Sequence, residues 1–282
     1  MTAPVTRFAP SPTGFLHLGH GYAALFAAAA AAGGRFLVRI EDIDAGRCRP
    51  AFETAILEDL AWLGLAWETP VLRQSQRGPA YRTALARLID LGVLYPCFCT
   101  RKEIAAEIAR AGAAPQEAAG LDGPPYPGTC RHLSGQERKT RMAAMGGAAL
   151  RIDAAKAAGL VGALSFTDAG EGEVAVDPLL LGDAVLARKD IGTSYHLAVV
   201  VDDAHQEVNL VTRGADLLPS THLQRLLQAL LDLPAPRYHH HPLIADETGA
   251  RLAKRNDARA IRVLRDEGMS PAEVRALAGF PD

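Results

Sequence analysis

Two histidines stand where a turn rich in proline and glycine leads into an alanine-rich segment. Residues 7–21 read Arg-Phe-Ala-Pro-Ser-Pro-Thr-Gly-Phe-Leu-His-Leu-Gly-His-Gly, which places His17 and His20 three residues apart. Side chains at positions i and i+3 share one face of a helix. At a helix N-terminus that face lies beside backbone N–H groups and the positive end of the helix dipole, where phosphate groups bind well. The pair therefore predicts a site that holds a polyphosphate while its charge is redistributed.

Three of the four cysteines indicate a metal site. Cys97 and Cys99 lie in one extended segment, so both thiols project to the same side, and Cys130 follows far along the chain. The surrounding segment is rich in loops and has little apolar core, and a tetrahedral zinc ion would tie its ends together. Three thiolates leave one ligand position open, for which His132 is the general candidate. Cys48 lies outside this group and is interpreted as a packed thiol.

Charged and polar residues stand at the ends of several expected strands. Arg7 ends the first strand, Ser11 lies in the turn after it, Glu41 follows the second strand, Tyr195 opens a later strand, and Arg213 follows the neighbour of that strand. In a parallel sheet these positions meet at one edge, where ligands bind. Fixed cations, an acidic group and hydrogen-bond donors together suit a small substrate that carries carboxylates and an ammonium group.

The elements that would position these residues alternate in the first third of the chain. They are a strand over 5–8, a helix over 18–32, a strand over 36–40, and helices over about 51–64 and 79–91. Such alternation predicts a parallel sheet with helices on both of its faces.

Residues 95–150 interrupt this pattern with a charged helix over about 101–111 and a loop rich in glycine and proline from Gly120 to Gly128. The pattern resumes with a continuous apolar strand over 197–201 that ends at Asp202 and Asp203. The later elements are a strand over 208–211, a helix over about 219–231, and a closing helix that begins with a capping box at Ser270.

Composition excludes several classes of protein. The 282 residues include 30 basic and 32 acidic side chains, so a globally basic nucleic-acid binder is excluded and any RNA contact must come from a local patch. Six basic residues between Arg251 and Arg265 form such a patch, with Arg259 and Arg262 expected on one face of a helix over about 258–267. The apolar stretch over 22–32 is about half the length that crosses a bilayer.

No signal peptide precedes the first strand, and cysteines without a secretory context indicate a reducing cytoplasm. We therefore expect a cytoplasmic monomer without membrane attachment. The three histidines at 239–241 fall in an expected strand, where alternate side chains point to opposite faces, so they do not predict a metal site.

The run from Arg7 to Gly21 resembles the HIGH motif of class I aminoacyl-tRNA synthetases, in the form used by their glutamyl and glutaminyl branch. The resemblance covers nearly the whole chain. It implies an α/β fold with a Rossmann-type parallel sheet, interrupted by a zinc-bearing insertion and followed by a short C-terminal helical segment. The implied divisions are 1–94 and 181–235 for the two halves of the catalytic domain, 95–180 for the insertion, and 236–282 for an ATP loop and the last helices.

The resemblance also assigns roles. For glutamate, Arg7 and Arg213 would bind a carboxylate, Glu41 the ammonium group, and Tyr195 would line the pocket together with Phe8, Ala9, Pro10 and Ser11. His17, Gly19 and His20 would contact ATP, with both histidines acting in catalysis. In the insertion, members of this branch can show Cys-x-Cys…Tyr-x3-Cys, which implies Tyr126 rather than His132 as the fourth zinc ligand beside Cys97, Cys99 and Cys130.

The second ATP motif of the family, KMSKS, is altered. Residues 251–255 read Arg-Leu-Ala-Lys-Arg, where members of this branch often have Lys-Leu-Ser-Lys-Arg. Lys254 preserves the second lysine as a catalytic cation for the phosphates, whereas Ala253 removes a hydroxyl. The resemblance places Arg251, Leu252, Ala253, Lys254 and Arg255 around ATP.

The implied activity is activation of L-glutamate by ATP with Mg²⁺, followed by transfer of glutamate to a tRNA. About 25 residues follow the KMSKS-like loop, so the chain is similar to the catalytic half of a glutamyl-tRNA synthetase without anticodon-binding domains. Paralogues of that kind attach glutamate to the queuosine base at the wobble position of tRNA(Asp). Val199, where glutamyl-tRNA synthetases usually have asparagine, favours them. The alternatives are a truncated synthetase that charges tRNA(Glu) and a catalytically silent tRNA-binding relic, which Ala253 would favour.

Overall fold

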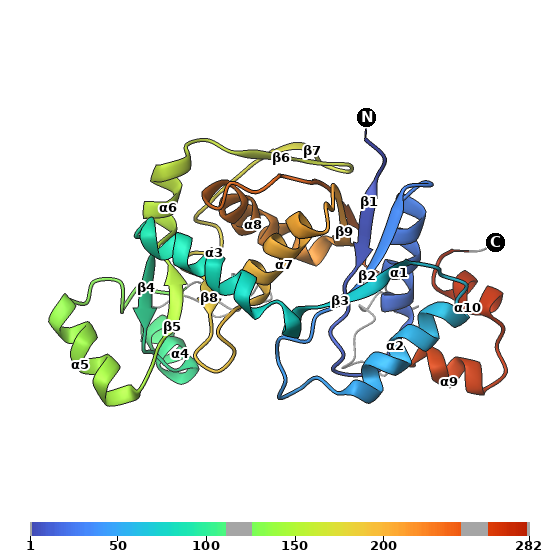
Figure 1. The fold of residues 1–282 in the computed structure, drawn as a ribbon, viewed down its shortest axis with the longest axis horizontal. Coiled ribbons are helices and arrows are strands. Elements are labelled where there is room, and N and C mark those ends of the chain that lie inside the picture. Colours follow the sequence, from blue (N-terminus) through green and yellow to red (C-terminus); the bar gives the residue numbers. More distant parts are fainter. Residues whose placement is uncertain (1, 111–125, 244–258, 281–282) are drawn as a thin grey trace.

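The computed structural model describes residues 2–110, 126–243 and 259–280. It confirms an α/β fold with a parallel sheet. Strands β1–β3, helices α1 and α2 and the C-terminal helices lie at one end of the molecule, and a smaller antiparallel sheet lies at the other (Figure 1). The KMSKS-like residues 251–255 and the part of the Gly/Pro-rich loop before Tyr126 lie outside the described residues.

The central sheet is built from two groups of parallel strands. In the first group, β1 (Val5–Phe8) pairs with β2 (Arg35–Ile40), and β2 pairs with β3 (Glu68–Arg73). In the second, β10 (Arg237–His241) lies between β9 (Leu210–Gly214) and β6 (Ser165–Asp168), and β7 (Gly172–Ala175) pairs antiparallel with β6.

The two groups meet at β1 and β9. The Asn209 N–H donates to Val5 O over 3.2 Å, and further along the two strands the Arg7 side chain donates to Thr212 O over 3.1 Å. The resulting spatial order of the strands is β3-β2-β1-β9-β10. Along the chain, strands are added outward on one side from β1 to β3 and on the other side from β9 to β10, so the order reverses between β1 and β9. The carboxyl ends of the two strands at such a reversal form the ligand crevice of doubly wound folds.

Two helical layers cover the central sheet. One core contains α1 (Leu18–Ala30), α2 (Pro50–Trp62), α9 (Ile261–Asp266) and α10 (Pro271–Leu277). The other core contains α3 (Gly78–Asp90), α6 (Ala154–Val161), α7 (Tyr195–His205) and α8 (Leu218–Leu230). Short 3-10 segments at Gln74–Gln76 (η1) and Ala215–Leu217 (η2) connect into α3 and α8. The predicted helices agree with α1, α2, α3 and α8 to within two residues.

The segment after α3 forms a separate small sheet. Its strands β4 (Leu94–Cys97), β5 (Ala149–Ile152) and β8 (Val185–Ala187) are antiparallel, and the helices α4 (Arg101–Arg110) and α5 (Gly135–Met145) lie between β4 and β5 in the chain (Figure 1). A capping box at Ser134 and Glu137 begins α5, and Gly146, in the left-handed conformation, ends it.

The expected strand over 197–201 is wrong, because these residues form the middle of helix α7. A run of buried apolar residues is compatible with either a strand or a helix. Leu197, Ala198, Val199 and Val200 are all at most 2% exposed because β8, α3 and α8 surround the helix. Ser194 caps its N-terminus by accepting from the Leu197 N–H. Tyr195 therefore opens a helix, and Asp202 and Asp203 lie near its end.

The expected basic helix face over 258–267 is also wrong in part. Helix α9 begins at Ile261, so Arg259 precedes it rather than sharing a face with Arg262. Each arginine has an acidic partner: Arg259 pairs with Glu267, and Arg262 pairs with Glu58 over 3.2 Å. No helix of the described residues is long and apolar enough to span a membrane.

Helix α2 carries one buried carboxyl group against the C-terminal helices. Asp59 is 0% exposed, and neither of its carboxylate oxygens has a hydrogen-bond partner among the described residues. Burial raises the pKa of this carboxyl to about 6, although the charges of Arg262 and Arg265 act in the opposite direction. The ionised form is therefore disfavoured in the folded protein but not in the unfolded chain.

Replacing Asp59 by asparagine should stabilise the protein above pH 6. The pKa of Asp59 is higher in the folded protein than in the unfolded chain. The contribution of Asp59 to the free energy of unfolding is therefore fully present below about pH 4 and is lost as the pH rises through 6. A shift of about two pKa units corresponds to roughly 3 kcal/mol in the free energy of unfolding. The Asp59→Asn variant should gain only part of this, because its amide is also a buried polar group. Denaturant unfolding at pH 8 and pH 5, with exposed Asp90→Asn as the control, measures the effect. An equal gain at both pH values would contradict it.

Candidate active site

Three arginines lie on the face of the central sheet that α7 and α8 cover. Neighbouring side chains of a strand point to opposite faces. Thr6 Oγ1 donates to Ala27 O of α1, whereas Arg7 points to α7. Arg39 of β2 and Arg213 of β9 point to the same covered side. All three are at most 6% exposed, which is unusual for arginine and indicates paired charges or a ligand.

Arg7 and Arg39 share one carboxylate. Arg7 donates through Nε to Asp203 Oδ1 over 3.0 Å, and Arg39 donates to the same oxygen over 2.7 Å. Arg39 also reaches Glu41 Oε1 over 3.4 Å. Burial opposes ionisation of Asp203, but the two guanidinium groups outweigh it and lower the pKa of this carboxyl. For Glu41, burial outweighs Arg39 and Arg7 and raises the pKa.

Arg213 is held differently, since its hydrogen-bond partners are all neutral. The shortest contacts are with Thr221 Oγ1 at 2.5 Å and Gln224 Oε1 at 2.7 Å, both on α8. Its Nε lies 3.1 Å from His240 Nε2 of β10, and its Nη1 lies 3.4 Å from the Tyr195 hydroxyl. Among the residues that the structure describes, no carboxylate pairs with this buried cation. The arrangement leaves its charge available to a substrate anion.

The two histidines begin α1 at the same crevice. The His17 N–H donates to His20 Nδ1 over 3.2 Å, and the two rings stack with centroids 3.7 Å apart. Gly19 lies between them in the first turn. The return segment of the chain closes over this turn, because the Ile261 N–H donates to Leu16 O over 2.8 Å and Ala260 bridges His17. The described residues that follow the KMSKS-like segment therefore lie beside His17.

A groove of about 1030 Å³ extends from Ser11 and Glu41, after β1 and β2, to Cys97 and Cys99 of the insertion. His17 and His20 are not among its lining residues. Of the residues expected to meet at one edge of the sheet, Ser11, Glu41 and Tyr195 line this groove, whereas Arg7 and Arg213 are buried and are not among its lining residues. Phe8 packs in the α1 core rather than in the groove. Among the turn residues expected near glutamate, Ala9 is half-buried and Pro10 is buried, with Pro10 O accepting from the Glu41 N–H over 3.0 Å.

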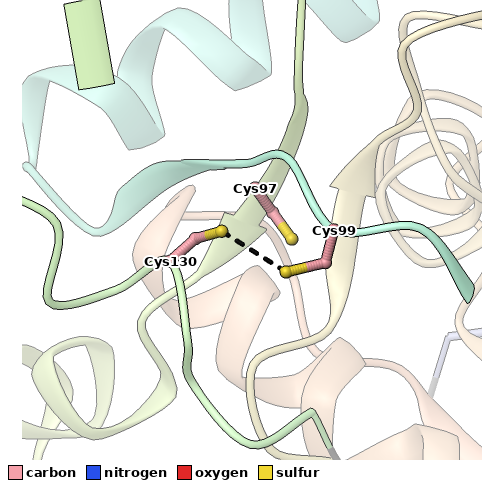
Figure 2. Close-up of side chains that lie close together, drawn as sticks. All are labelled: Cys97, Cys99 and Cys130. Carbon is pink, nitrogen blue, oxygen red and sulfur yellow. Dashed lines mark hydrogen bonds between the residues drawn. The ribbon is translucent and has the colours of Figure 1, made fainter. Parts of the chain in front are cut away.

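The cysteine cluster lies at the other end of the groove. Figure 2 shows the thiols of Cys97, Cys99 and Cys130 converging, and their Sγ atoms all lie within 4.8 Å of one another. Cys99 Sγ lies 3.5 Å from Cys130 Sγ and 3.3 Å from the Tyr126 hydroxyl. His132 is exposed and does not belong to this group. The geometry favours Tyr126 over His132 as the fourth donor.

Comparison with known proteins identifies the family of the chain. Residues 4–278 match the family model described as tRNA synthetases class I (E and Q), catalytic domain. The chain belongs to this family. A Rhodobacter capsulatus protein named glutamyl-Q tRNA(Asp) synthetase is 51% identical over 284 residues, which cover 98% of this chain and 100% of the relative. A Nocardia farcinica protein of the same name is 45% identical, over 96% of this chain and 82% of the relative.

A solved structure shows the same fold. The crystal structure of a glutamate tRNA ligase from Elizabethkingia meningosepticum, in complex with its amino acid, superposes with a TM-score of 0.78 at 27% identity. The match covers 98% of this chain and 60% of that ligase, so the chain spans less than two thirds of the larger protein. The prediction of a class I synthetase of the glutamyl branch is thus confirmed.

Several residues of this synthetase site were not predicted from the sequence. Arg39 could have been noticed, because a charge inside the apolar run Phe-Leu-Val-Arg-Ile must be paired when the strand is buried. Asp203 was placed at the end of a strand, so its contact with Arg7 was not foreseen. Gln224 and His240 carry no local signal, since their contact with Arg213 depends on how α8 and β10 pack.

Proposed function

We propose that this synthetase activates L-glutamate with ATP and transfers it to the queuosine base at the wobble position of tRNA(Asp). The observation that supports glutamate is Arg213, a buried guanidinium with neutral partners beside Tyr195, which lines the same groove as Glu41. An acidic side chain supplies the missing negative charge, and an amide does not. The names of the relatives at 51% and 45% identity support the tRNA.

The first step requires positioned charge and no protein nucleophile. In this proposal, Glu41 holds the ammonium group and Arg7 and Arg213 hold carboxylate, so that the α-carboxylate faces the α-phosphate of ATP. Attack forms glutamyl-adenylate and releases pyrophosphate. His17 and His20 at the start of α1 would stabilise the charge that moves onto the leaving phosphates. From its place in the KMSKS-like sequence, Lys254 would add a cation, and ATP would enter as its Mg²⁺ complex.

The second step requires an RNA segment to reach the adenylate. The groove from Tyr195 to the insertion is lined by five cations and three acidic residues, although the whole chain carries a net charge of −2. The cations are Arg47, Arg101, Arg151, Arg188 and Lys189. Such a local excess suits a phosphate backbone. A hydroxyl of the queuosine cyclopentenediol would then attack the acyl carbon, with AMP as the leaving group.

The cysteine cluster fits zinc as a structural ion. Zn–S bonds of about 2.3 Å place tetrahedral sulfur ligands about 3.8 Å apart. The separation of Cys99 and Cys130, at 3.5 Å, is close to this value, and the third Sγ lies within 4.8 Å of both. Cys97, Cys99, Cys130 and the Tyr126 hydroxyl would hold the ion, which would fasten the loop around residue 130 to the strand that ends at Cys97.

Replacing Cys130 by serine should remove about one zinc ion per chain and lower the melting temperature, because the small core of the insertion depends on this cluster. Cys48→Ser lies outside the cluster and serves as the control. Tyr126→Phe should also weaken zinc retention, whereas His132→Ala should not. Elemental analysis of protein purified without chelator, combined with thermal unfolding, tests this. Full zinc content in the Cys130 variant would refute the site.

The proposed function is tested in two stages. Glutamate-dependent exchange of pyrophosphate into ATP, with glutamine in parallel, tests activation. Labelled glutamate is then offered with tRNA(Asp) that contains or lacks queuosine and with tRNA(Glu). Labelling only of queuosine-containing tRNA(Asp) is the expected result. Labelling of tRNA(Glu) instead would favour the truncated glutamyl-tRNA synthetase, and no activation of any amino acid would favour the silent relic.

A further inference from the structure

His240 of β10 is held at both ring nitrogens. Its Nδ1 lies 2.7 Å from Asp168 Oδ2, and its backbone N–H donates to the same oxygen over 3.1 Å. Its Nε2 lies 3.1 Å from Arg213 Nε and 3.1 Å from Thr221 Oγ1. The side chains of His240 and Asp168 are only 2% and 1% exposed, so water does not compete for these contacts.

The partners determine the tautomer of the imidazole. An ionised carboxylate can only accept hydrogen bonds, so Nδ1 carries the proton that faces Asp168. A guanidinium can only donate, so Nε2 presents its lone pair to Arg213. Burial and the nearby Arg213 charge lower the pKa of His240 to about 4, against the opposing effect of Asp168, which keeps the ring neutral at physiological pH.

Asp168 is itself fixed as an acceptor. Its Oδ1 accepts from the Gly170 N–H over 2.9 Å and from the Glu171 N–H over 3.2 Å. Burial opposes ionisation, but these hydrogen bonds and those from His240 outweigh it and lower the pKa of the carboxyl. The negative charge of Asp168 is thus present but stands one imidazole ring away from Arg213.

Arg7 shows what a direct contact would do. Asp203 binds Arg7 through Nε at 3.0 Å and through Nη2 at 3.4 Å, so a carboxylate of the protein occupies that edge of the guanidinium. At Arg213 the acceptor for Nε is instead a neutral imidazole nitrogen. The guanidinium is oriented through Nε without an ion pair.

We propose that Asp168 and His240 are positioning residues that fix Arg213 through a neutral Nδ1–H imidazole, so that its charge is kept for the side-chain carboxylate of the amino acid substrate. This inference rests on the proposed function. It makes glutamate selectivity depend on a buried histidine of β10 and on a carboxylate of β6 that accepts hydrogen bonds from that histidine and from its own turn.

Two substitutions at position 240 separate the two contacts. His240→Asn can retain a donor toward Asp168 but has no atom at the place of Nε2, so Arg213 Nε loses its acceptor. His240→Gln is long enough to place its amide oxygen near that position and retains the acceptor. His239→Asn, one residue earlier on the opposite face against Phe26, is the matched control.

We expect His240→Asn to raise the KM for glutamate in pyrophosphate exchange about tenfold or more, the effect of losing one hydrogen bond to a charged group. His240→Gln should restore most of this loss. The KM for ATP should change little in either variant, and kcat should fall less than the affinity for glutamate. Exchange is measured with and without tRNA(Asp). A purely structural role would instead change both KM values in parallel and lower the melting temperature of both variants equally.

Nitrogen-15 NMR of the wild-type protein gives an independent readout, because the chemical shifts of neutral histidine distinguish its tautomers. The Nδ1–H form at His240 is expected, and an Nε2–H form would overturn the inference. An unchanged glutamate KM in His240→Asn would also overturn it. Failure of the wild-type protein to activate glutamate would refute the proposed function, and the tautomer measurement would still decide how Arg213 is held.

Discussion

Replacing Gln224 by glutamate should remove most of the affinity for L-glutamate while the fold is retained. The two side chains have the same length, and Gln224 Oε1 already accepts from Arg213 over 2.7 Å. The substitution places a permanent carboxylate on a buried cation that has neutral partners in the wild-type protein. Losing a hydrogen bond to a charged partner costs about 1.5–3 kcal/mol, so the KM for glutamate should rise roughly 10- to 100-fold.

Gln224→Met separates charge from packing. Methionine has a similar length and removes the acceptor without adding a charge, so Arg213 should remain able to bind a carboxylate and the KM for glutamate should rise much less. Pyrophosphate exchange over a range of glutamate concentrations, at fixed ATP, compares the two variants, and thermal unfolding confirms that both fold. If Gln224→Met were as impaired as Gln224→Glu, the charge of Arg213 would not be the basis of glutamate recognition.

The same pair of variants bears on selectivity. In the wild-type protein, glutamine would leave Arg213 buried beside an amide and without a counter-charge, which discriminates strongly against it. In Gln224→Glu that counter-charge is internal, so the preference for glutamate over glutamine should shrink mainly through the loss of glutamate affinity. The ratio of the two kcat/KM values is therefore a sharper measure of the role of Arg213 than either value alone.

Local sequence was sufficient to predict where a residue lies in its own element. It placed His17 and His20 at the start of a helix and Arg7, Glu41 and Arg213 at or near the ends of strands, and a parallel sheet brings such ends to one edge. The cysteine spacing likewise predicted a cluster that the fold brings together.

Sequence was insufficient where long-range packing decides. Residues 197–201 are as apolar as a buried strand, and only the surrounding β8, α3 and α8 make them a helix. That change of element moves Asp203 from a strand end onto Arg7 and Arg39. The run of histidines at 239–241 does not show which neighbours each side chain will have. In β10, His239 and His241 face Phe26 of α1, whereas His240 faces Arg213.

Replacing His20 by alanine should lower the rate of adenylate formation by roughly 10²–10³, the usual loss for one donor to a transition state. His20 Nδ1 accepts from the His17 N–H at the start of α1. In the proposed function, Nε2 would be the atom that contacts the departing phosphates, at the positive end of the helix dipole. The stacked ring of His17, 3.7 Å away between centroids, holds the imidazole in this orientation.

His20→Asn tests whether the loss is catalytic or structural. Asparagine can place an oxygen near the position of Nδ1 and keep the hydrogen bond from the His17 N–H, but it has no counterpart of Nε2. The alanine variant removes both and should lose about 1 kcal/mol of stability through the broken cap, whereas the asparagine variant should melt close to the wild-type protein.

Both variants should nevertheless show the same large drop in pyrophosphate exchange, with the KM for glutamate little changed because Arg213 and Glu41 are intact. Near-normal exchange in His20→Asn would mean that His20 serves only to begin α1, and the chemistry of the leaving phosphates would then have to be assigned to other residues.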